Sequence, residues 1–378
     1  MLNNIKSFKF VNSDFNNLKC KTARVRKFFL INKSRTILPF NLEWDDVDSD
    51  NVISMHELFL LLDKNYVEDC YSFLRFNYVH EFIKFAISAP NCAKFLNLGL
   101  KFNRCKKYNG FISSNFRKII INNKIYVCSE INFLCLQKNL RKKFFVQQLI
   151  KEITRRLNCF GIKAAIYTTG LPFSKPLFEA HYFYFSVNSF KNTNFCKNSG
   201  EKTNDSCEKK RRIWINFNPF ENDEFLNYNY LKNIRKEFRK KRIYKHFNKK
   251  DFYYWVRFIK GIKYAFIEKK NSFNNNKNYL ISFYSLPCKT IKYKNFSYFY
   301  DAYFYYGIKL TERSFLMEEI VSLCGKLGFD LLYILEGQYS NTVLEKIGFH
   351  KSGSKINFYF LGIDHRRFSP YENSLIFF

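Results

Sequence analysis

The sequence has 378 residues, and its 63 Lys and Arg outnumber 32 Asp and Glu to give a formal net charge of +31. This length suits two modest domains or one two-lobed unit, and the charge favours partners that carry phosphate or other anions. The longest apolar cluster, LFLLL near Leu60, is far below the about 20 residues of a membrane-spanning helix, so no integral membrane protein is expected.

The first part of the chain mixes helical and extended patterns. Residues 1 to about 40 are basic and aromatic with little periodicity, and we expect an arm laid on the body. Spaced leucines predict a helix over His56–Asp69, and a short helix is predicted over Glu81–Ser88, before Pro90. β-branched residues and turn signals predict strand, turn, strand, turn, strand over Lys106–Leu136.

The segment from Glu130 to Asn158 joins an apolar strand to an amphipathic helix through a basic loop. The helix is predicted from Phe145 to about Asn158, with one apolar face formed by Val146, Leu149, Ile150, Ile153 and Leu157. The unpaired N–H groups of its first turn suit a phosphate, as do the loop cations Lys138, Arg141, Lys142 and Lys143. From the pattern alone, a solvated basic loop is favoured over a phosphate site at roughly two to one. Gly161 ends the helix, and a strand is predicted over residues 163–170.

The second half repeats this order of elements. Residues 189–212 have lost most apolar content and are a candidate linker or surface loop. A strongly basic helix is predicted over Leu231–Lys250, and an Asn-rich turn separates two strands near residues 264–270 and 280–286. A helix and then a strand follow over Glu312–Leu335, with Gly328 as the break. Each half therefore contains hairpin strands, a helix and a further strand, which indicates two related lobes.

Cysteine and histidine are not arranged as metal ligands. The 11 Cys and six His include no Cys-x-x-Cys pair and no other metal-ligand spacing, so we expect no metal site and reduced thiols. The N-terminal MLNNIKSFKF has no apolar signal core. We therefore expect a cytoplasmic protein that acts as a monomer.

Several short motifs occur in an order that resembles one enzyme family. In the first half they are NYVED (Asn65–Asp69), EINFLCL (Glu130–Leu136), KEITRRLN (Lys151–Asn158) and YTTG (Tyr167–Gly170). SFYSLP (Ser282–Pro287), DAYFYY (Asp301–Tyr306) and the segment Gly328–Phe349 continue the match, which fades between residues 190 and 250. The chain is similar to the eukaryotic glycylpeptide N-myristoyltransferases. The resemblance implies an α+β fold of two acetyltransferase-like (acyl-CoA N-acyltransferase) lobes related by a pseudo-twofold, with mixed sheets flanked by helices.

The resemblance also implies a division of labour between the lobes. Residues 1–190 would bind myristoyl-CoA, a co-substrate rather than a permanently bound cofactor, and residues 191–378 would bind the peptide. The family transfers the C14 acyl chain to the amine of an N-terminal glycine. The matching CoA and acyl-chain positions are Phe8, Lys9, Phe10, Val11, Phe133, Leu134, Cys135, Leu136, Arg141, Lys142, Lys143, Phe144, Phe145, Val146 and Tyr167. The matching peptide positions are Tyr66, Val67, Glu68, Asp69, Phe76, Tyr78, Tyr182, Tyr184, Cys288 and Tyr303.

Five residues match the catalytic positions of the family. The backbone N–H groups of Phe133 and Leu134 match its oxyanion hole, and Asn132 and Thr168 match polar residues that guide the amine. The general base of the family is the free carboxylate at the end of the chain, here that of Phe378. The plain structural interpretations are strand core for Phe133 and Leu134, turn caps for Asn132 and Thr168, and an apolar tail tucked into the core.

Three alternatives stay open at this stage. Cys135 raises a covalent acyl-cysteine route, but a cysteine on an apolar strand is more often core, and we prefer direct transfer. A homologue that binds acyl-CoA without turnover is the second. The third is an RNA- or ribosome-associated protein that uses the basic stretch 231–250, for which a solvated helix face is about three times more favoured. Composition drift in an A+T-rich genome explains the larger share of the charge.

The chain departs from the family pattern where that family recognises a basic residue of its peptide. The acids after NYVED are replaced by Cys70 and Tyr71, and a late Gly-Asp-Gly turn becomes Ser352-Gly353-Ser354. We therefore expect a relaxed preference for Lys or Arg in the substrate. The basic loop is also altered: in the run Lys142-Lys143-Phe144-Phe145-Val146-Gln147 one cation has moved and the small residue of the family has grown.

Overall fold

The computed structural model describes most of the chain. The described residues are 36–38, 41–66, 74–90, 92–141, 144–172, 174–188, 217–219, 224–268, 280–290, 298–308, 315–363 and 366–377. The helices are α1 (Val52–Asn65), α2 (His80–Ile87), α3 (Phe145–Cys159), α5 (Glu224–Phe238), α6 (Lys249–Val256), α7 (Phe315–Lys326) and α8 (Asn341–Ile347). Among the described residues, no helix combines the length and the apolar character needed to cross a membrane.

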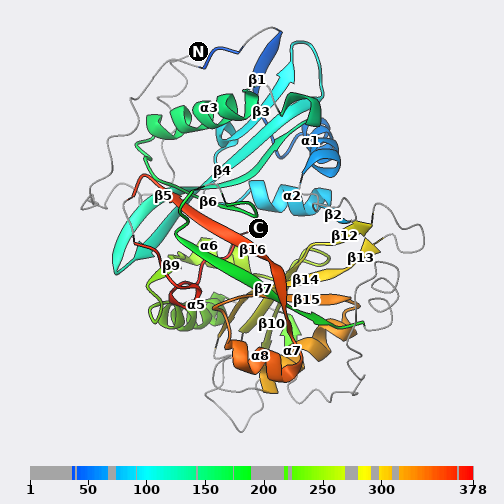
Figure 1. Ribbon diagram of the computed structural model, residues 1–378, viewed down its shortest axis with the longest axis vertical. Helices are drawn as coiled ribbons and strands as arrows, with labels where there is room; N and C mark the ends of the chain where they lie inside the picture. The colour runs from blue at the N-terminus through cyan, green and yellow to red at the C-terminus, as the bar shows by residue number, and fades with distance from the viewer. Residues whose placement is uncertain are drawn as a thin grey trace.

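One continuous sheet runs through both halves of the molecule (Figure 1). Its strands lie in the order β1-β3-β4-β5-β6-β16-β7-β15-β14-β11-β10-β8, and β9 pairs with β4. Their bounds are β1 (Leu42–Asp46), β3 (Asn97–Phe102), β4 (Tyr108–Ile121), β5 (Lys124–Leu136), β6 (Ala165–Thr169), β7 (Phe178–Ser186), β8 (Phe217–Pro219), β9 (Ile243–Lys245), β10 (Lys263–Glu268), β11 (Leu280–Ser285), β14 (Asp301–Ile308), β15 (Leu331–Leu335) and β16 (His350–Leu361). A separate small sheet joins β2 (Leu74–Phe76), β12 (Cys288–Thr290) and β13 (Tyr298–Phe299).

The same unit occurs once in each half, as the sequence pattern predicted. In the first, the bulged hairpin β4–β5 is followed by α3 and by β6, which runs parallel to β5. In the second, the bulged pair β11–β14 is followed by α7 and by β15, which runs parallel to β14. The fold is thus α+β, with a mixed sheet flanked by helices.

Two strands cross between the halves. β7 precedes residue 190 but pairs with β15, and β9 follows residue 191 but pairs with β4. The candidate linker 189–212 lies outside the described residues, so the boundary between the lobes stays a prediction.

Helix α3 is amphipathic, but its buried face differs in part from the predicted one. Leu149, Ile153 and Leu157 are buried, whereas Ile150 is 43% exposed. Glu152 is buried instead, because it pairs with Arg155 at 2.7 Å and with Arg156 at 3.0 Å. Satisfied ion pairs therefore replace apolar contact on part of the face that meets the sheet.

Two predictions of secondary structure were wrong. Lys106–Leu136 forms two long strands rather than three, because β4 runs unbroken from Tyr108 to Ile121. Its polar side chains are satisfied inside the fold: Ser113 donates to Asn97 at 2.8 Å, and Asn115 donates to the Ala86 carbonyl at 3.3 Å. The basic stretch 231–250 is not one helix, because α5 ends at Phe238 and strand β9 follows. Most of the predicted N-terminal arm lies outside the described residues.

Candidate active site

Strand β5 breaks its regular pairing at Phe133 and Leu134. Phe111 of β4 lies opposite Cys135 and Ser113 lies opposite Asn132, so Phe133 and Leu134 together face a single residue of β4. Phe133 has a left-handed backbone with φ of 55°, and such a β-bulge turns backbone groups out of the ladder. This places two adjacent N–H groups in an irregular strand, which suits the binding of an oxyanion.

The backbone N–H of Phe133 is directed toward Tyr66. Burial raises the pKa of the Tyr66 phenol, and a hydrogen bond from the Phe133 backbone to its oxygen opposes that rise. The two rings lie 5.7 Å apart. The Phe133 N–H group therefore already has an oxygen atom outside the strand ladder as its partner.

Strands β5 and β6 separate beside this bulge. They run parallel as far as the pair Glu130–Ile166, and beyond it β6 pairs only with β16 on its other edge, where Thr168 lies opposite Phe358. Asn132 and Thr168 follow two residues after that last pair, one on each side of the opening. Both are half-buried. The opening is where a substrate group can enter between the strands.

Helix α3 begins close to this opening with an uncapped N-terminus. Its N-cap residue, Phe144, has φ of 57° and makes no side-chain cap, and its first turn contains no acidic residue. Arg141 donates to the carbonyls of Leu136, at 3.1 Å, and Asn65, so its guanidinium holds the basic loop against α1. The first-turn N–H groups of α3 carry the partial positive charge that favours an anion.

The C-terminal segment, defined here as Asn373–Phe377, lies in the middle of the molecule (Figure 1). Leu375, Ile376 and Phe377 are at most 5% exposed. The ring of Phe377 lies 5.6 Å from that of Phe358, which is the residue opposite Thr168. The buried tail is thus adjacent to the opening between β5 and β6. Phe378 lies outside the described residues.

A buried ion cluster joins this tail to β5, and sequence reasoning missed it. Arg117 donates to Glu130 at 2.7 Å, and the Lys245 ammonium lies 3.3 Å from the same carboxylate. Lys245 also donates to the carbonyl of Ile376 at 2.6 Å, and Asn132 donates to Glu130 at 3.4 Å. We call Glu130, Arg117 and Lys245 the Glu130 cluster. Only the position of Glu130 inside EINFLCL hinted at it, because its partners are distant in sequence.

The pKa shifts within the Glu130 cluster indicate that its three side chains are ionised. Burial alone would raise the pKa of Glu130, but the attraction of Lys245 and Arg117 outweighs it and holds that pKa below its ordinary value. Burial lowers the pKa of Lys245 to about 8, against the opposing effect of Glu130. At neutral pH the cluster therefore contains one carboxylate and two cations.

The predicted peptide positions that the structure describes form one chain of aromatic contacts. It starts at Phe133, whose ring lies 5.7 Å from that of Tyr78, and continues through Phe76 to Tyr303 at 6.3 Å. Tyr303 contacts Tyr182 at 5.8 Å. Burial raises the pKa values of the Tyr78, Tyr182 and Tyr303 phenols, which therefore stay neutral hydrogen-bonding groups at physiological pH.

Two tyrosines of this aromatic chain were missed from the sequence. Tyr333 stacks on Tyr303 at 4.7 Å and links it to Tyr184 at 6.2 Å, and Tyr284 stacks on Tyr303 at 5.3 Å. Their place inside the apolar strands β15 and β11 was the available signal, but it is equally typical of plain core. Cys288 is buried on β12, which pairs with β2, the strand that contains Phe76.

Cys135 is a poor nucleophile in this fold. It is 3% exposed, and burial raises the pKa of its thiol to about 12. The thiolate that an acyl-cysteine route requires would therefore be scarce at neutral pH. Among the described residues, no group of three His, Cys, Asp or Glu side chains is placed to hold a metal ion.

Several predicted site residues lie outside the described residues. They are Phe8, Lys9, Phe10, Val11, Val67, Glu68, Asp69, Lys142, Lys143 and Phe378. The remaining CoA positions surround the opening, since Leu136 ends β5, Phe145 begins α3 and Tyr167 lies on β6, stacked on Tyr359 at 5.3 Å.

A bulged strand, a diverging parallel partner and an uncapped helix N-terminus together form the arrangement expected of an acyl-CoA-dependent acyltransferase. Among solved structures, Saccharomyces cerevisiae N-myristoyltransferase with bound myristoyl-CoA has a similar fold, with a TM-score of 0.78 and 23% sequence identity over 90% of this chain and 83% of that chain.

Sequence comparisons identify the family. Residues 23–179 match the N-terminal domain and residues 215–366 the C-terminal domain of myristoyl-CoA:protein N-myristoyltransferase. The glycylpeptide N-tetradecanoyltransferase of Plasmodium falciparum is 30% identical over 345 residues, which cover 87% of this chain and 81% of that protein. Glycylpeptide N-tetradecanoyltransferase 2 of Bos taurus is 30% identical over 331 residues, covering 85% and 66%. The chain belongs to the N-myristoyltransferase family of acyltransferases.

Proposed function

We propose that this protein transfers a myristoyl group from myristoyl-CoA to the amine of an N-terminal glycine by direct attack on the thioester. One observation supports this mechanism above the others. Lys245 connects the Ile376 carbonyl, two residues before the end of the sequence, to Glu130, two residues before Asn132. The tail and the bulged strand therefore meet at one place.

The thioester carbonyl would lie at the bulge of β5. Its oxygen would accept hydrogen bonds from the N–H groups of Phe133 and Leu134, in the place where the Tyr66 oxygen now meets the first of them. Removal of one such donor costs about 10²–10³ in rate in other enzymes. The pyrophosphate of CoA would bind the first turn of α3, and the acyl chain would bury its methylenes in the lobe.

The amine must lose a proton before it attacks. An α-amino group has a pKa of about 8, so most of it is ammonium at neutral pH. In our proposal the carboxylate of Phe378 takes that proton, while Asn132 and Thr168 orient the amine. The nitrogen then attacks the carbonyl carbon, the carbon–sulfur bond breaks, and CoA leaves as the thiol.

A transfer assay tests the proposal against a homologue that only binds acyl-CoA. The purified chain is mixed with myristoyl-CoA and a Gly-peptide, and acylated peptide is measured by mass spectrometry in single-turnover and steady-state experiments. We expect acylated peptide in both the single-turnover and the steady-state experiment. Binding of myristoyl-CoA without any acylated peptide would identify a degenerate homologue instead.

We predict little preference for Lys in the part of the peptide that the family reads with acids. Replacing the Asp of Gly-Asp-Gly by Gly353 removes a charge, and an exposed ion pair contributes at most about 1 kcal/mol, or roughly 5-fold. The ratio of kcat/KM for Gly-peptides with Lys or Ala should therefore stay below about 5-fold.

A variant that restores the acid serves as the control. A Cβ added at Gly353 meets no heavy atom within 4 Å, so Gly353→Asp is sterically open. The variant should prefer the Lys peptide more strongly than the unchanged chain does. A large Lys preference of the unchanged chain would contradict the prediction.

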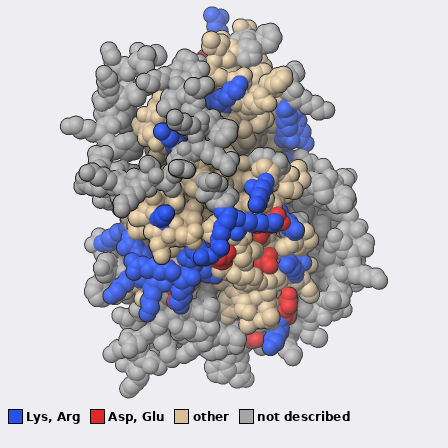
Figure 2. All heavy atoms as spheres, turned by 60° about the vertical axis from the view of Figure 1, so that its left-hand side comes forward, with Lys and Arg blue, Asp and Glu red and all other residues tan. Residues whose placement is uncertain are grey.

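A basic surface keeps the RNA or ribosome alternative testable. Figure 2 shows Lys and Arg gathered on the face where α5 and β9 lie, with few acidic residues among them. Burial and the nearby charges of Arg235, Lys118 and Arg239 lower the pKa of His246, as expected where cations crowd. Binding to ribosomes or RNA that weakens steeply with added salt would support this second function, and no binding at low salt would contradict it.

A further inference from the structure

The C-terminal segment and the residue before it are fastened to strand β9 and to the residue that precedes that strand. Arg242 donates its backbone N–H to the Glu372 carbonyl at 2.8 Å, and the Ser374 N–H donates to the Ile243 carbonyl at 2.9 Å. Two residues further along each partner, the Lys245 side chain donates to the Ile376 carbonyl at 2.6 Å. At the last of these positions a side chain replaces the backbone, and it is the contact nearest to the chain end.

Lys245 is itself fixed from three sides. Its ammonium lies 3.3 Å from the Glu130 carboxylate and 4.2 Å from the centre of the Phe377 ring. Arg117 holds Glu130 from the other side and stacks over Trp255 at 4.5 Å. Lys245 and Glu130 are at most 3% exposed. A desolvated ion cluster of this kind has few alternative arrangements, because any separation leaves an uncompensated buried charge.

The same carboxylate also reaches the residue beside the bulge. Asn132 donates to Glu130 at 3.4 Å. One buried acid therefore contacts both the side chain proposed to guide the amine and the cation that holds the tail. Stability of the tail alone would not require this second contact.

We propose that Lys245, oriented by Glu130, is a positioning residue that aims the terminal carboxylate at the glycine amine. This inference rests on the proposed function, because it assigns a role only if the carboxylate of Phe378 is the base. Lys245 touches neither substrate in this scheme. It acts through the backbone of Ile376 and through its charge.

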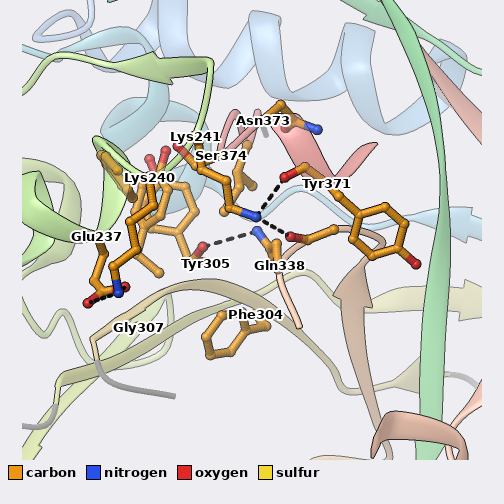
Figure 3. Close-up of a pocket in the computed structure, with 14 residues that line it drawn as sticks. Glu237, Lys240, Lys241, Phe304, Tyr305, Gly307, Gln338, Tyr371, Asn373 and Ser374 are labelled. Carbon is orange, nitrogen blue, oxygen red and sulfur yellow. Dashed lines mark hydrogen bonds and ion pairs between the residues drawn. The ribbon is translucent and has the colours of Figure 1, made fainter. Parts of the chain in front are cut away.

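The test compares Lys245, which contacts the C-terminal segment, with Lys241, which contacts the turn before it. Lys245→Met removes the hydrogen bond to Ile376 but keeps a long apolar side chain, and Arg117 still compensates Glu130. Lys241→Met is the matched control, because Lys241 donates to the carbonyls of Gly337 at 3.0 Å and Tyr371 at 2.9 Å and lies beside a cavity of about 300 Å³ (Figure 3). Lys241 makes no ion pair with the Glu130 cluster among the described residues. Lys245→Arg is the conservative variant, because it keeps a positively charged hydrogen-bond donor at this position.

We expect Lys245→Met to lower kcat between about 10- and 100-fold, because small displacements of a reacting group cost that much. The KM for myristoyl-CoA should stay within about 3-fold, because its binding elements on β5 and α3 are untouched. Lys241→Met should stay within about 3-fold of the unchanged chain in kcat, and Lys245→Arg should recover most of the loss.

The pH dependence of kcat gives a readout that packing alone would not move. A nearby ammonium favours the charged carboxylate, so its removal raises the pKa of that carboxylate and moves the acid limb of the profile to higher pH. The other titratable or charged groups that face Lys245 are retained in the variant, namely Cys128, Glu130, Arg117, Asp251, Lys263, Tyr305 and Tyr306, and Arg117 still holds the pKa of Glu130 down.

Three outcomes would overturn the inference. Equal kcat values for Lys245→Met and Lys241→Met would remove the special role of Lys245. A loss of kcat that only follows a loss of melting temperature, with the acid limb unmoved, would show a structural role. Absence of transfer by the unchanged chain would contradict the proposed function itself, and the inference would fall with it, whereas the first two outcomes leave that function intact.

Discussion

Adding one glycine after Phe378 is expected to lower kcat for myristoyl transfer by at least about 100-fold, the lower range for loss of a general base. The added residue moves the free carboxylate by about 3.5 Å and leaves an amide at its former position. An amide cannot accept the proton of the glycine ammonium at neutral pH. Binding of myristoyl-CoA should be unaffected.

The matched control keeps the carboxylate and changes the side chain. Phe378→Leu leaves the length and the terminal charge unaltered, and we expect its kcat to stay within about 5-fold of the unchanged chain, as for a conservative apolar substitution. Steady-state rates and equilibrium binding of myristoyl-CoA are measured on all three proteins. Equal activity of the extended chain would exclude the terminal carboxylate as the base.

Gly337→Ala is expected to destabilise the protein by about 3 kcal/mol or more, the sum of left-handed strain and a steric overlap. Gly337 follows β15 with φ of +90°, and an added Cβ would lie 2.1 Å from the Pro370 carbonyl oxygen. That contact is with backbone, so the turn Pro370–Glu372 must move. The turn leads directly into the C-terminal segment, so kcat should fall as well.

Gly328→Ala is the control that separates the cost of the left-handed backbone from the cost of steric overlap. Gly328 has φ of +81°, but an added Cβ meets no heavy atom within 4 Å. Its substitution should cost only about 1 kcal/mol, the left-handed penalty by itself, with kcat unchanged. Urea unfolding of both variants provides the comparison. Similar losses at the two glycines would mean that the contact with Pro370 relaxes without cost.

Local patterns in the sequence were enough for many elements. The spacing of Leu149, Ile153 and Leu157 predicted α3. The β-branched residues on both sides of INNK predicted a hairpin, and its second strand is β5. The order of motifs indicated the family and therefore the two-lobed fold. These features are encoded locally, because helix and strand periodicity depend on neighbours a few residues apart.

Local patterns failed where distant partners decided the outcome. A second turn was expected within Lys106–Leu136, yet Ser113 and Asn115 lie inside the unbroken strand β4, where Asn97 and the Ala86 carbonyl satisfy their polar groups. The basic stretch after Phe238 read as helix, yet residues 243–245 pair with β4 as β9.

The sequence by itself determined helix α3, the turn at INNK between β4 and β5, and the family, because all three depend on short ordered segments. Only the tertiary structure decided the Glu130 cluster, since Arg117, Glu130 and Lys245 come from β4, β5 and β9. It also decided that the aromatic side chains form one contact chain from Phe133 to Tyr184. The physical reason is that the energy of a buried charge or a stacked ring depends on the groups around it. Those groups come from distant parts of the sequence and meet only when the whole sheet forms.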